Sequence, residues 1–503
     1  MDIIDILKNE HPDACEYRKG FPNVGKRQDN KEFGDAVKRI NEAWNYYDIE
    51  LRKIPSNQGT LNLGSGDPLN FPPFPGAIKF LEKEMKGNIY QYGATAGEPK
   101  HCKMIADYLV REGFPEYVDS SNVIVTSSTT NGFYLILKSL FRPYDVILMT
   151  APNYGLFAFM PERMNISVEL LPLFEDDNYL INPNNLETRI IEINEILENK
   201  YGNSLGYVPC VRGFLNINPH NPLGTVMSKK NIELLESIGS ICKKHNVLII
   251  DDLVYRDLSY DTNNIAKPIG TIPEYFDNTI SLFGLSKSFG LAQARAGFVV
   301  ANDMVVRVLR DNIFYTMDSA SVLQSSLLAG TYNVSNLRDQ EYKKYIRNII
   351  PYYVFNSYLC MALFNGIDSI NNTPYYESVL ELLSSTIENE KLLQIICEGV
   401  PCTNVIIHPS SGFFLLVDFS ELKNYSDIEC EKDLLEYLYI QAGVKFLVGQ
   451  SISWPNKEQM IMRMTYSFEP KVLITVIAKI NVAIRKKLYE NVYSSKNMEY
   501  KLT

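Results

Sequence analysis

"TISLFGLSKSFGLAQARAGFVVA", residues 279–301, places a loop of small residues between two apolar runs, "TISLF" and "GFVVA". Apolar runs of this length are typical of strands that are buried on both faces of a sheet. The loop carries one lysine, Lys287, between Ser286 and Ser288, and Arg295 follows eight residues later. A buried lysine without a partner loses solvation free energy or gives up its proton. The stretch therefore predicts a reactive amine at the end of a buried strand.

Similar short apolar runs lie upstream of this stretch. They are "VIVT" at 123–126, "VILM" at 146–149, "FLNI" at 214–217 and "VLII" at 247–250. Such runs, separated by helical segments, predict an α/β fold with a mostly parallel sheet covered by helices on both faces. One of these helices can be read directly: Ser228 can cap it, and it ends at His245 and Asn246. Its apolar face is expected to carry Leu235, Ile238 and Cys242.

A polar cluster follows each apolar run that leads into a loop. In chain order the clusters are "SSTTNG", "APNYG", "NPHNPLG", "DDLVY" and "GLSKS". In open α/β sheets, ligands bind beyond the carboxyl ends of the strands. We therefore expect the five clusters to converge at one edge of the sheet and to form a single site there.

The character of the sequence changes near residue 330. Helical sequence rich in Tyr and Leu, "DQEYKKYIRNIIPYYVFNSYLCMALF", leads to strand-like segments that include "GFFLLVDFS", "GVKFLVG" and "MIMRMTYSF". This pattern predicts a smaller α+β domain at 331–503, after a large domain at 59–330. Residues 1–58 have mixed charge and weak patterning, and we expect an arm or a helix that packs on the smaller domain.

Composition excludes several classes of partner. The chain has 503 residues, with 49 Lys and Arg against 59 Asp and Glu, and a net charge of -10. This balance disfavours nucleic acid or an acidic membrane surface as a partner, so a bound anion must be captured locally.

No cysteines form CxxC pairs, which indicates free thiols rather than disulfides or a metal site. They are Cys15, Cys102, Cys210, Cys242, Cys360, Cys397, Cys402 and Cys430.

The N-terminal sequence, "MDIIDILKNEHPDACEYRKG", lacks a basic stretch followed by an apolar run, so it does not resemble a secretory signal. No stretch approaches the ~18 consecutive apolar residues of a membrane-spanning helix. We therefore expect a soluble cytoplasmic protein.

The motifs "NLGSGDP", "YGATAG", "NPLG", "DLVY", "GLSKSFGLAQARAGF" and "MRMTYS" carry a resemblance. In their order and approximate spacing, over roughly residues 60–485, the chain resembles the class I/II aminotransferases, which are fold-type-I enzymes dependent on pyridoxal 5'-phosphate. Each motif alone is weak, whereas the ordered set is specific. The resemblance implies a seven-stranded type of sheet in the large domain, a pyridoxal 5'-phosphate cofactor, amino acid and 2-oxo acid substrates, and a homodimer with shared active sites.

The resemblance implies that Lys287 forms a Schiff base with the cofactor and moves a proton during the reaction. The local chemistry agrees, because an amine in a water-poor pocket has a lowered pKa and attacks aldehydes. Arg295 would hold the cofactor phosphate, since a guanidinium fork suits a phosphate dianion. The other phosphate ligands implied are Ser286, Ser128, Thr129 and Thr130. The family typically has glycine where Ser128 stands, and "SSTTNG" read alone is equally explained as a helix cap.

Asp252 matches the carboxylate that pairs with the ring nitrogen of the cofactor, where it keeps the nitrogen protonated. Asp251 is the competing choice, but only Asp252 has the family's spacing of three residues to Tyr255. Tyr255 and Asn221 would bond the cofactor's 3′-oxygen. Asp251 is equally explained as a helix cap.

Tyr154 occupies the position of the aromatic ring that stacks on the cofactor. Three residues later some family members have a histidine that supports the aspartate, whereas this chain has Phe157. The groups that support Asp252 must therefore differ from those of such relatives.

Arg463 matches the arginine that binds the substrate α-carboxylate as a bidentate pair. Gly66 matches the glycine whose backbone lies beside the same carboxylate, and Asn221 would contribute to substrate binding too. Tyr92 matches a tyrosine that reaches the phosphate of the neighbouring subunit, which would make a homodimer obligatory. Tyr90 is a rival for this role, and both are equally explained as core aromatic residues.

The resemblance predicts an aminotransferase, with a lyase, decarboxylase or ACC-synthase-like enzyme on the same fold as the alternative, because the pocket selects which bond breaks. Relatives specific for dicarboxylates use an arginine where this chain has Asn312, so a dedicated aspartate or glutamate substrate is not favoured, although Arg310 or Arg307 could reach in. A transcription factor with an aminotransferase-like domain would need a basic N-terminal module, which residues 1–58 do not supply. An inactive homologue is disfavoured because Lys287 and its expected partners are present.

Overall fold

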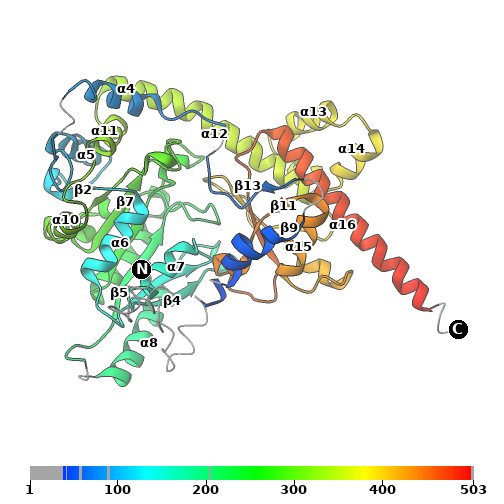
Figure 1. The fold of residues 1–503 in the computed structure, drawn as a ribbon, viewed down its shortest axis with the longest axis horizontal. Helices are drawn as coiled ribbons and strands as arrows, with labels where there is room; N and C mark the ends of the chain where they lie inside the picture. Colours follow the sequence, from blue (N-terminus) through cyan, green and yellow to red (C-terminus); the bar gives the residue numbers. More distant parts are fainter. Residues whose placement is uncertain are drawn as a thin grey trace, which may run out of the picture.

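The computed structural model describes residues 38–40, 42–55, 59–68, 70–87, 91–202 and 205–499. In this part of the chain, a seven-stranded sheet with its helices lies beside a smaller C-terminal α+β part (Figure 1). Residues 1–37, which are part of the expected arm and include Cys15, lie outside the described residues. Tyr90, the rival candidate for the dimer contact, lies outside them too.

The large sheet has the strand order β2-β8-β7-β6-β5-β3-β4. β8 runs antiparallel to both of its neighbours, and the remaining pairs are parallel. The expected mostly parallel, seven-stranded sheet is therefore confirmed. The strands are β2 (Val123–Thr126), β3 (Val146–Ala151), β4 (Ser167–Pro172), β5 (Val211–Ile217), β6 (Leu248–Asp252), β7 (Thr279–Gly284) and β8 (Gly297–Val300).

Helices cover both faces of this sheet because successive side chains on each strand point to opposite sides. Ile147 and Met149 of β3 pack in one buried cluster with α6 and α10, whereas Val146 and Leu148 pack in another with α8 and α9. The helices of this part are α4 (Pro75–Glu84), α5 (Pro99–Arg111), α6 (Thr129–Leu140), α7 (Leu156–Glu162), α8 (Pro183–Tyr201), α9 (Ile232–Lys244), α10 (Asp303–Met317) and α11 (Val322–Thr331).

α9 is the helix that the sequence predicts between two strands. Its predicted face, Leu235, Ile238 and Cys242, is fully buried, and the helix ends before His245. The start differs from the prediction, because the Ser228 side chain accepts from the backbone N–H of Lys230 and caps a preceding 3₁₀ turn (Lys229–Asn231). The α-helix itself begins only after that turn.

The C-terminal part contains a four-stranded antiparallel sheet of order β12-β13-β10-β9 and a parallel pair, β1-β11. The strands are β1 (Leu61–Asn62), β9 (Asn404–Val405), β10 (Phe414–Asp418), β11 (Val444–Lys445), β12 (Leu447–Val448) and β13 (Ile461–Thr465). Its helices are α13 (Tyr376–Thr386), α14 (Glu390–Cys397), α15 (Glu431–Ala442) and α16 (Pro470–Glu499). The β1–β11 pair carries residues 61–62 onto the C-terminal part, although they lie early in the chain.

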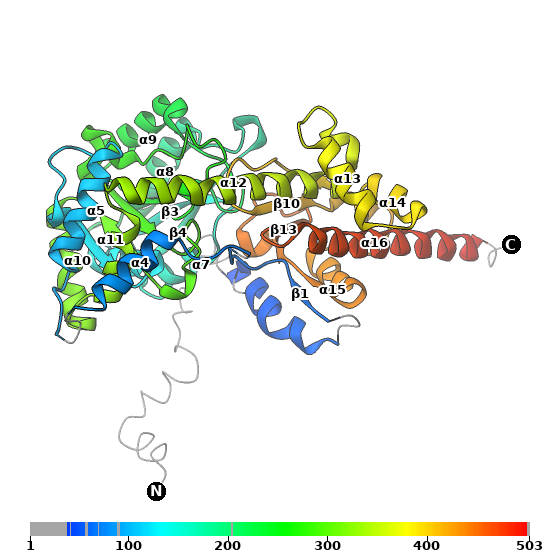
Figure 2. The same cartoon turned by 90° about the horizontal axis from the view of Figure 1, so that it is seen from above.

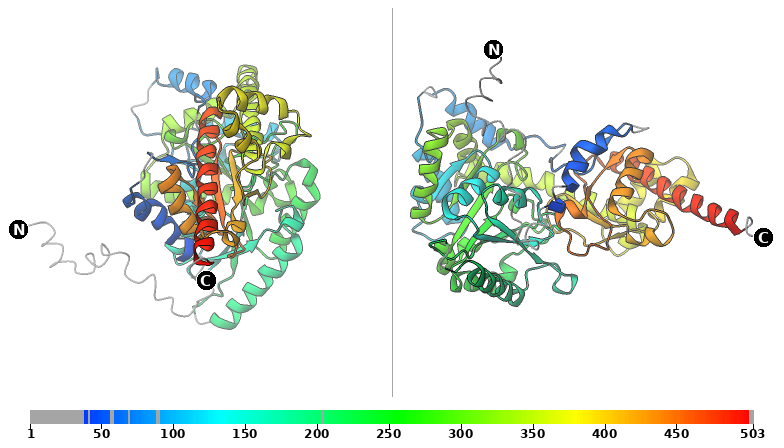
Figure 3. Two further views of the ribbon diagram at one scale, coloured as in Figure 1. Left: turned by 90° about the vertical axis from the view of Figure 1, so that its right-hand side faces the viewer. Right: turned by 60° about the horizontal axis from the view of Figure 1, so that its bottom comes forward.

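The helical segment 42–53 also lies against the C-terminal part, beside α15 (Figure 3). The Tyr46 hydroxyl donates to the Glu436 carboxylate over 2.8 Å. The indole N–H of Trp44 donates to the main-chain oxygen of Ser451 over 3.2 Å. These contacts place the early segment next to residues more than 350 positions away in the sequence.

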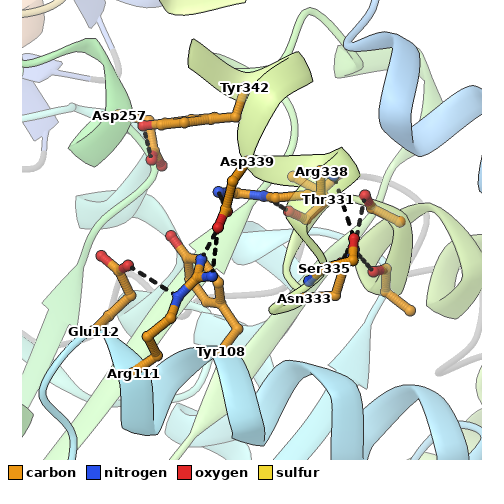
Figure 4. Close-up of polar contacts among 12 residues, drawn as sticks. Tyr108, Arg111, Glu112, Asp257, Thr331, Asn333, Ser335, Arg338, Asp339 and Tyr342 are labelled. Atoms are coloured by element: carbon orange, nitrogen blue, oxygen red, sulfur yellow. Dashed lines mark hydrogen bonds and ion pairs between the residues drawn. The ribbon is translucent and has the colours of Figure 1, made fainter.

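The long helix α12 (Asn336–Asn365) runs from the large sheet to the C-terminal part (Figure 2). At its first turns, the guanidinium of Arg338 lies 4.8 Å from the Tyr108 ring centroid and 4.3 Å from that of Tyr342 (Figure 4). The Tyr342 hydroxyl donates to Asp257 over 2.7 Å. Further along, the Asn356 side chain donates to the main-chain oxygen of Tyr466 over 2.8 Å. The helix thus joins the loop after β6 to the loop after β13.

Candidate active site

A cavity of about 560 Å³ opens where the carboxyl ends of the large sheet meet the C-terminal part. All five loop clusters of the sequence contribute to it, so the predicted convergence holds in the structure. The lining residues are Trp44, Tyr47, Asn62, Gly64, Ser65, Gly66, Asp67, Thr129, Thr130, Tyr154, Leu156, Phe157, Ile217, Asn221, Asp252, Val254, Tyr255, Ser286, Lys287, Ala292, Gln293, Arg295, Phe414 and Arg463.

Lys287 lies just beyond the end of β7, and its Nζ atom donates to the main-chain oxygen of Gly66 over 2.6 Å. Burial lowers the pKa of Lys287 to about 8, and the charges of Arg463 and Arg295 act in the same direction. The charges of Asp67 and Asp252 oppose this shift. A neutral amine, which attacks carbonyl carbon, is therefore accessible near neutral pH.

The start of α6 forms a cradle for an anion. Thr129 and Thr130 open the helix and line the cavity, so the start of α6, where backbone N–H groups lack partners within the helix, lies at its wall. Gly297 makes room for this turn, because a Cβ atom there would lie 2.8 Å from the backbone nitrogen of Thr129. The cradle is completed by Ser286 and Arg295 from the β7–β8 loop.

Arg295 is exposed and has a left-handed backbone, with φ of 50°. Its Nη1 atom donates to the main-chain oxygen of Ala292 over 3.1 Å, and no acidic partner for it occurs among the described residues. The guanidinium is therefore available to a bound anion at the cavity wall.

Ser128 has a backbone conformation that serine rarely adopts, with φ of 123° and ψ of 165°. This region is essentially restricted to glycine. Its side chain accepts from the backbone N–H of Asn131 over 3.1 Å and so caps α6, and the residue is buried outside the cavity lining. The structure thus does not bring its side chain to the cavity with Thr129 and Thr130.

Asp251 and Asp252 end β6 and point to opposite faces of the sheet. Asp252 lines the cavity, whereas Asp251 accepts from the Asn216 side chain over 2.8 Å and from the backbone N–H of Ile269 over 2.9 Å. Burial raises the pKa of each carboxyl to about 7. Of the two acids, only Asp252 can contact a molecule in the cavity.

The support of Asp252 comes from the backbone. Its Oδ1 atom accepts from the backbone N–H of Val254 over 3.1 Å, and the charge of Lys287 favours its ionised form. Phe157, at the position of the family's histidine, is buried and packs edge-on against Tyr154, with ring centroids 5.4 Å apart. Tyr154 lines the same wall of the cavity as Phe157.

Tyr255 and Asn221 lie at the cavity wall near Arg463. The Asn221 side-chain oxygen accepts from Arg463 Nη1 over 3.3 Å, while Arg463 Nη2 donates to the main-chain oxygen of Gly64 over 2.7 Å. Burial raises the pKa of Tyr255, so its phenol stays protonated and can donate.

Arg463 is almost fully buried, and its Nε atom has no hydrogen-bond partner among the described residues. Its guanidinium carbon lies 4.1 Å from the ring centroid of Phe414. A buried unsatisfied donor is costly, and a bound carboxylate is the partner whose two oxygens suit this fork. A Cβ atom at Gly66 would lie 3.1 Å from Lys287 Nζ, so the glycine lets the amine approach its backbone closely.

Tyr92 is 88% exposed and does not line the cavity, so within one copy of the chain it does not lie with the other site residues. Asn312 also lies away from the cavity, where it donates to the Ser139 hydroxyl over 2.8 Å. Arg307 pairs with Asp303, and Arg310 lies 3.5 Å from Asp311 on the same helix.

Several lining residues were not predicted from the sequence. Trp44 and Tyr47 come from the segment expected to be an arm or a helix that packs on the smaller domain, and Asn62 and Asp67 belong to the "NLGSGDP" motif without an expected role. Phe414 comes from β10. The spacing of Trp44 and Tyr47, one helical turn apart, was the one available signal for a shared face.

Among the described residues, no group of His, Cys, Asp or Glu is suited to hold a metal ion. In the same part of the chain, no helix has both the length and the apolar character that crossing a membrane requires. Every cysteine described is free of disulfide bonds.

A family model described as Aminotransferase class I and II matches residues 58–478. An aspartate aminotransferase of Musicola paradisiaca is 26% identical over 278 residues, which cover 55% of this chain and 64% of that protein. Kynurenine–oxoglutarate transaminase 1 of Mus musculus is 25% identical over 294 residues, with the same coverages of 55% and 64%. The matches thus span just under two thirds of these relatives.

The solved structure of an aspartate aminotransferase from Thermus thermophilus with maleate has a TM-score of 0.65 to this chain at 16% identity. The structural match covers 89% of this chain and 96% of the Thermus thermophilus chain. This likeness establishes the fold, and the predicted fold type is confirmed.

Proposed function

Because the chain belongs to the aminotransferase class I and II family, we propose that it is a pyridoxal 5'-phosphate-dependent enzyme that transfers an amino group between an L-amino acid and a 2-oxo acid. The observation that carries the proposal is one cavity that combines a buried amine, Lys287, a buried carboxylate, Asp252, and two guanidinium groups, Arg295 and Arg463. An amine, an acid and two separate anion-binding groups match the needs of a phosphorylated aldehyde and an amino acid.

The residues present fit this cofactor. Thr129, Thr130, Ser286 and Arg295 would hold its phosphate, because the start of α6 favours an anion and so does a guanidinium that has no acidic partner in the described part of the chain. Asp252 would hold the ring nitrogen, and Tyr255 and Asn221 the 3′-oxygen, with Tyr154 against the ring. When bound, pyridoxal 5'-phosphate supplies an electron sink for the substrate's α-carbon.

The chain's own residues then carry out the remaining tasks. Lys287 would supply the amine that holds the cofactor covalently, and once freed, its Nζ atom would move the proton from the substrate α-carbon to the C4′ atom of the cofactor. In the cofactor-free chain the pKa of Lys287 is lowered to about 8, so the amine there gains and loses a proton near neutral pH. Arg463 and the backbone at Gly66 would hold the substrate α-carboxylate. Over one cycle an amino acid becomes a 2-oxo acid, and a second 2-oxo acid becomes an amino acid.

We also infer a homodimer in the cytoplasm. Large apolar side chains are exposed along α10 and on α6, a pattern that favours a protein partner. They include Met304, Val308, Phe314, Tyr315, Met317 and Tyr134. Tyr92, exposed and outside the cavity, is available to a second copy of the chain, where it would reach the phosphate. Free cysteines among the described residues support the cytoplasmic location.

The test is to load the purified protein with pyridoxal 5'-phosphate and to incubate it with amino acids and 2-oxo acids in turn. We expect a new 2-oxo acid and a new amino acid in equal amounts. Release of ammonia or carbon dioxide instead would favour the lyase or decarboxylase alternative. Lys287→Ala should abolish both the covalent attachment of the cofactor, detected by mass spectrometry after borohydride reduction, and the product.

A further inference from the structure

Trp44 and Tyr47 form an aromatic wall of the active-site cavity. They lie one turn apart in the helical segment 42–53, with ring centroids 5.8 Å apart and ring planes at 75°. Both line the same cavity as Lys287 and Arg463. An edge-to-face pair of this kind presents a broad carbon surface and adds attraction beyond the area that it buries.

The polar atoms of the wall are satisfied away from a ligand. The Trp44 indole N–H donates to the main-chain oxygen of Ser451 over 3.2 Å, and the Tyr47 hydroxyl donates to the Asn62 side-chain oxygen. The Lys445 ammonium lies 3.6 Å from the Tyr47 ring centroid. The half-buried Trp44 ring therefore offers carbon surface to a ligand, whereas the Tyr47 ring is almost fully buried, and the hydrogen-bond donors of both are already used.

The wall is held in place by both parts of the molecule. Ser451 belongs to the C-terminal part, whereas Gly155 lies at the start of α7 in the large part. A Cβ atom at Gly155 would lie 2.9 Å from Trp44 Nε1, so only glycine lets the indole approach this closely. The indole is thus fixed between the two parts, close to Tyr154.

Within one copy of the chain, the described lining residues offer no further cation for a second carboxylate. Among the described lining residues, the cations are Lys287, Arg295 and Arg463, and the proposed function uses all three. The remaining acid besides Asp252 is Asp67, whose negative charge would repel an acidic side chain. Lys445 packs under Tyr47 and does not line the cavity.

We propose that the amino acid substrate has an aromatic side chain, which packs against Trp44 and Tyr47 while Arg463 holds its α-carboxylate. This inference rests on the proposed function and specifies its substrate class. Trp44 is then a specificity-determining residue, because a ring of the substrate would replace water on its exposed carbon surface. An aspartate or glutamate side chain would instead leave a carboxylate facing carbon and Asp67, which is unfavourable.

The experiment follows the first half of the reaction with the loaded full-length protein and no 2-oxo acid. The change in cofactor absorbance is measured against the concentration of phenylalanine, tyrosine, tryptophan, alanine and aspartate. Alanine serves as the reference substrate, because it has the α-amino and α-carboxylate groups without a side chain to contact the wall. We expect the ratio of rate constant to dissociation constant to be at least about a hundredfold higher for an aromatic amino acid than for aspartate, since buried groups left unpaired discriminate strongly.

Two variants localise the preference. Reactivity here is the ratio of rate constant to dissociation constant. Trp44→Ala should lower the reactivity with phenylalanine relative to alanine by about tenfold or more, whereas Trp44→Phe should keep most of this preference. Tyr117→Ala removes an aromatic side chain that is 61% exposed and lies outside the cavity, and it should leave this preference unchanged. If Trp44→Ala does not fold, Tyr47→Leu takes its place with the same expected fall.

The outcomes separate the two proposals. If no amino acid changes the cofactor spectrum or forms a 2-oxo acid, the proposed function itself is wrong. If alanine or aspartate reacts but aromatic amino acids do not react faster, the enzyme stands and the substrate class is overturned. If aromatic preference survives in Trp44→Ala, the substrate class stands and the role of Trp44 is overturned, because another surface then selects the side chain.

Discussion

The Nζ atom of Lys287 lies 2.6 Å from the main-chain oxygen of Gly66, a residue 221 positions earlier in the chain. This hydrogen bond joins the loop after β7 to the segment that follows β1, and β1 pairs with the C-terminal part. The amine expected to bind the cofactor therefore rests against the backbone expected to face the substrate. Attachment of the proposed cofactor would use two of the three N–H bonds of Nζ and so compete with this contact, which would link the two subsites through one side chain.

The first prediction concerns the pH dependence of Lys287. Burial lowers its pKa to about 8, so the amine in the cofactor-free protein is protonated below that pH and neutral above it. Only the neutral amine reacts with acylating reagents. In a pH series with trace acetic anhydride, read by mass spectrometry, labelling of Lys287 should rise to half its maximum near pH 8. Labelling of ordinary surface lysines should reach half its maximum near pH ~10.4. A Lys287 curve that coincides with theirs would contradict the prediction.

The two neighbouring acids of β6 should behave differently when each is changed to asparagine. Asp252→Asn should lower kcat by at least about a hundredfold, the loss typical of removing one well-placed electrostatic group, and should retain most of the stability. Asp251→Asn should instead reduce the free energy of unfolding by about 1–3 kcal/mol, because its new N–H₂ group would face the donors of Asn216 or Ile269. Steady-state kinetics and urea denaturation of both variants measure the contrast, and exchanged effects would refute the assignment.

Ser128→Gly should stabilise the protein. Serine at φ of 123° and ψ of 165° is strained, and such backbone strain costs of order 1–3 kcal/mol. Glycine relieves the strain and loses only a few tenths of a kcal/mol as a helix cap, so a net gain of about 1 kcal/mol is expected. Ser128→Ala, which keeps the strain and loses the cap, should be destabilised. Chemical denaturation of the cofactor-free variants gives both values, and a loss of stability in the glycine variant would count against the strained conformation.

Arg463→Lys should raise KM for the amino acid by about tenfold or more, since lysine cannot form the paired hydrogen bonds of a guanidinium with a carboxylate. The matched control is Arg338→Lys, another buried arginine, whose guanidinium packs on the Tyr108 and Tyr342 rings outside the cavity lining. That variant should lower the melting temperature and leave KM unchanged. Equal KM values for Arg463→Lys and the parent protein would remove Arg463 from substrate binding.

The buried strands of the large sheet could be predicted because apolar character on both faces identifies them without knowledge of their neighbours. β4 (Ser167–Pro172) was not among the predicted runs, since it is an edge strand that carries Glu169 and ends in a proline. The antiparallel direction of β8 was not predicted either. The loop between β7 and β8 has no crossover helix, which a parallel connection would need.

The sequence by itself determined which chemical groups follow each strand, and therefore that Lys287, Asp252 and Arg295 gather at one sheet edge, because parallel strands end on the same side. Only the tertiary structure decided which of two adjacent acids faces the cavity, since alternation along a strand separates them but packing selects the face. It likewise decided that Trp44 and Tyr47 enter the site. Contacts between segments hundreds of residues apart, such as Trp44 with Ser451, depend on the packing of the whole chain and leave no local pattern in the sequence.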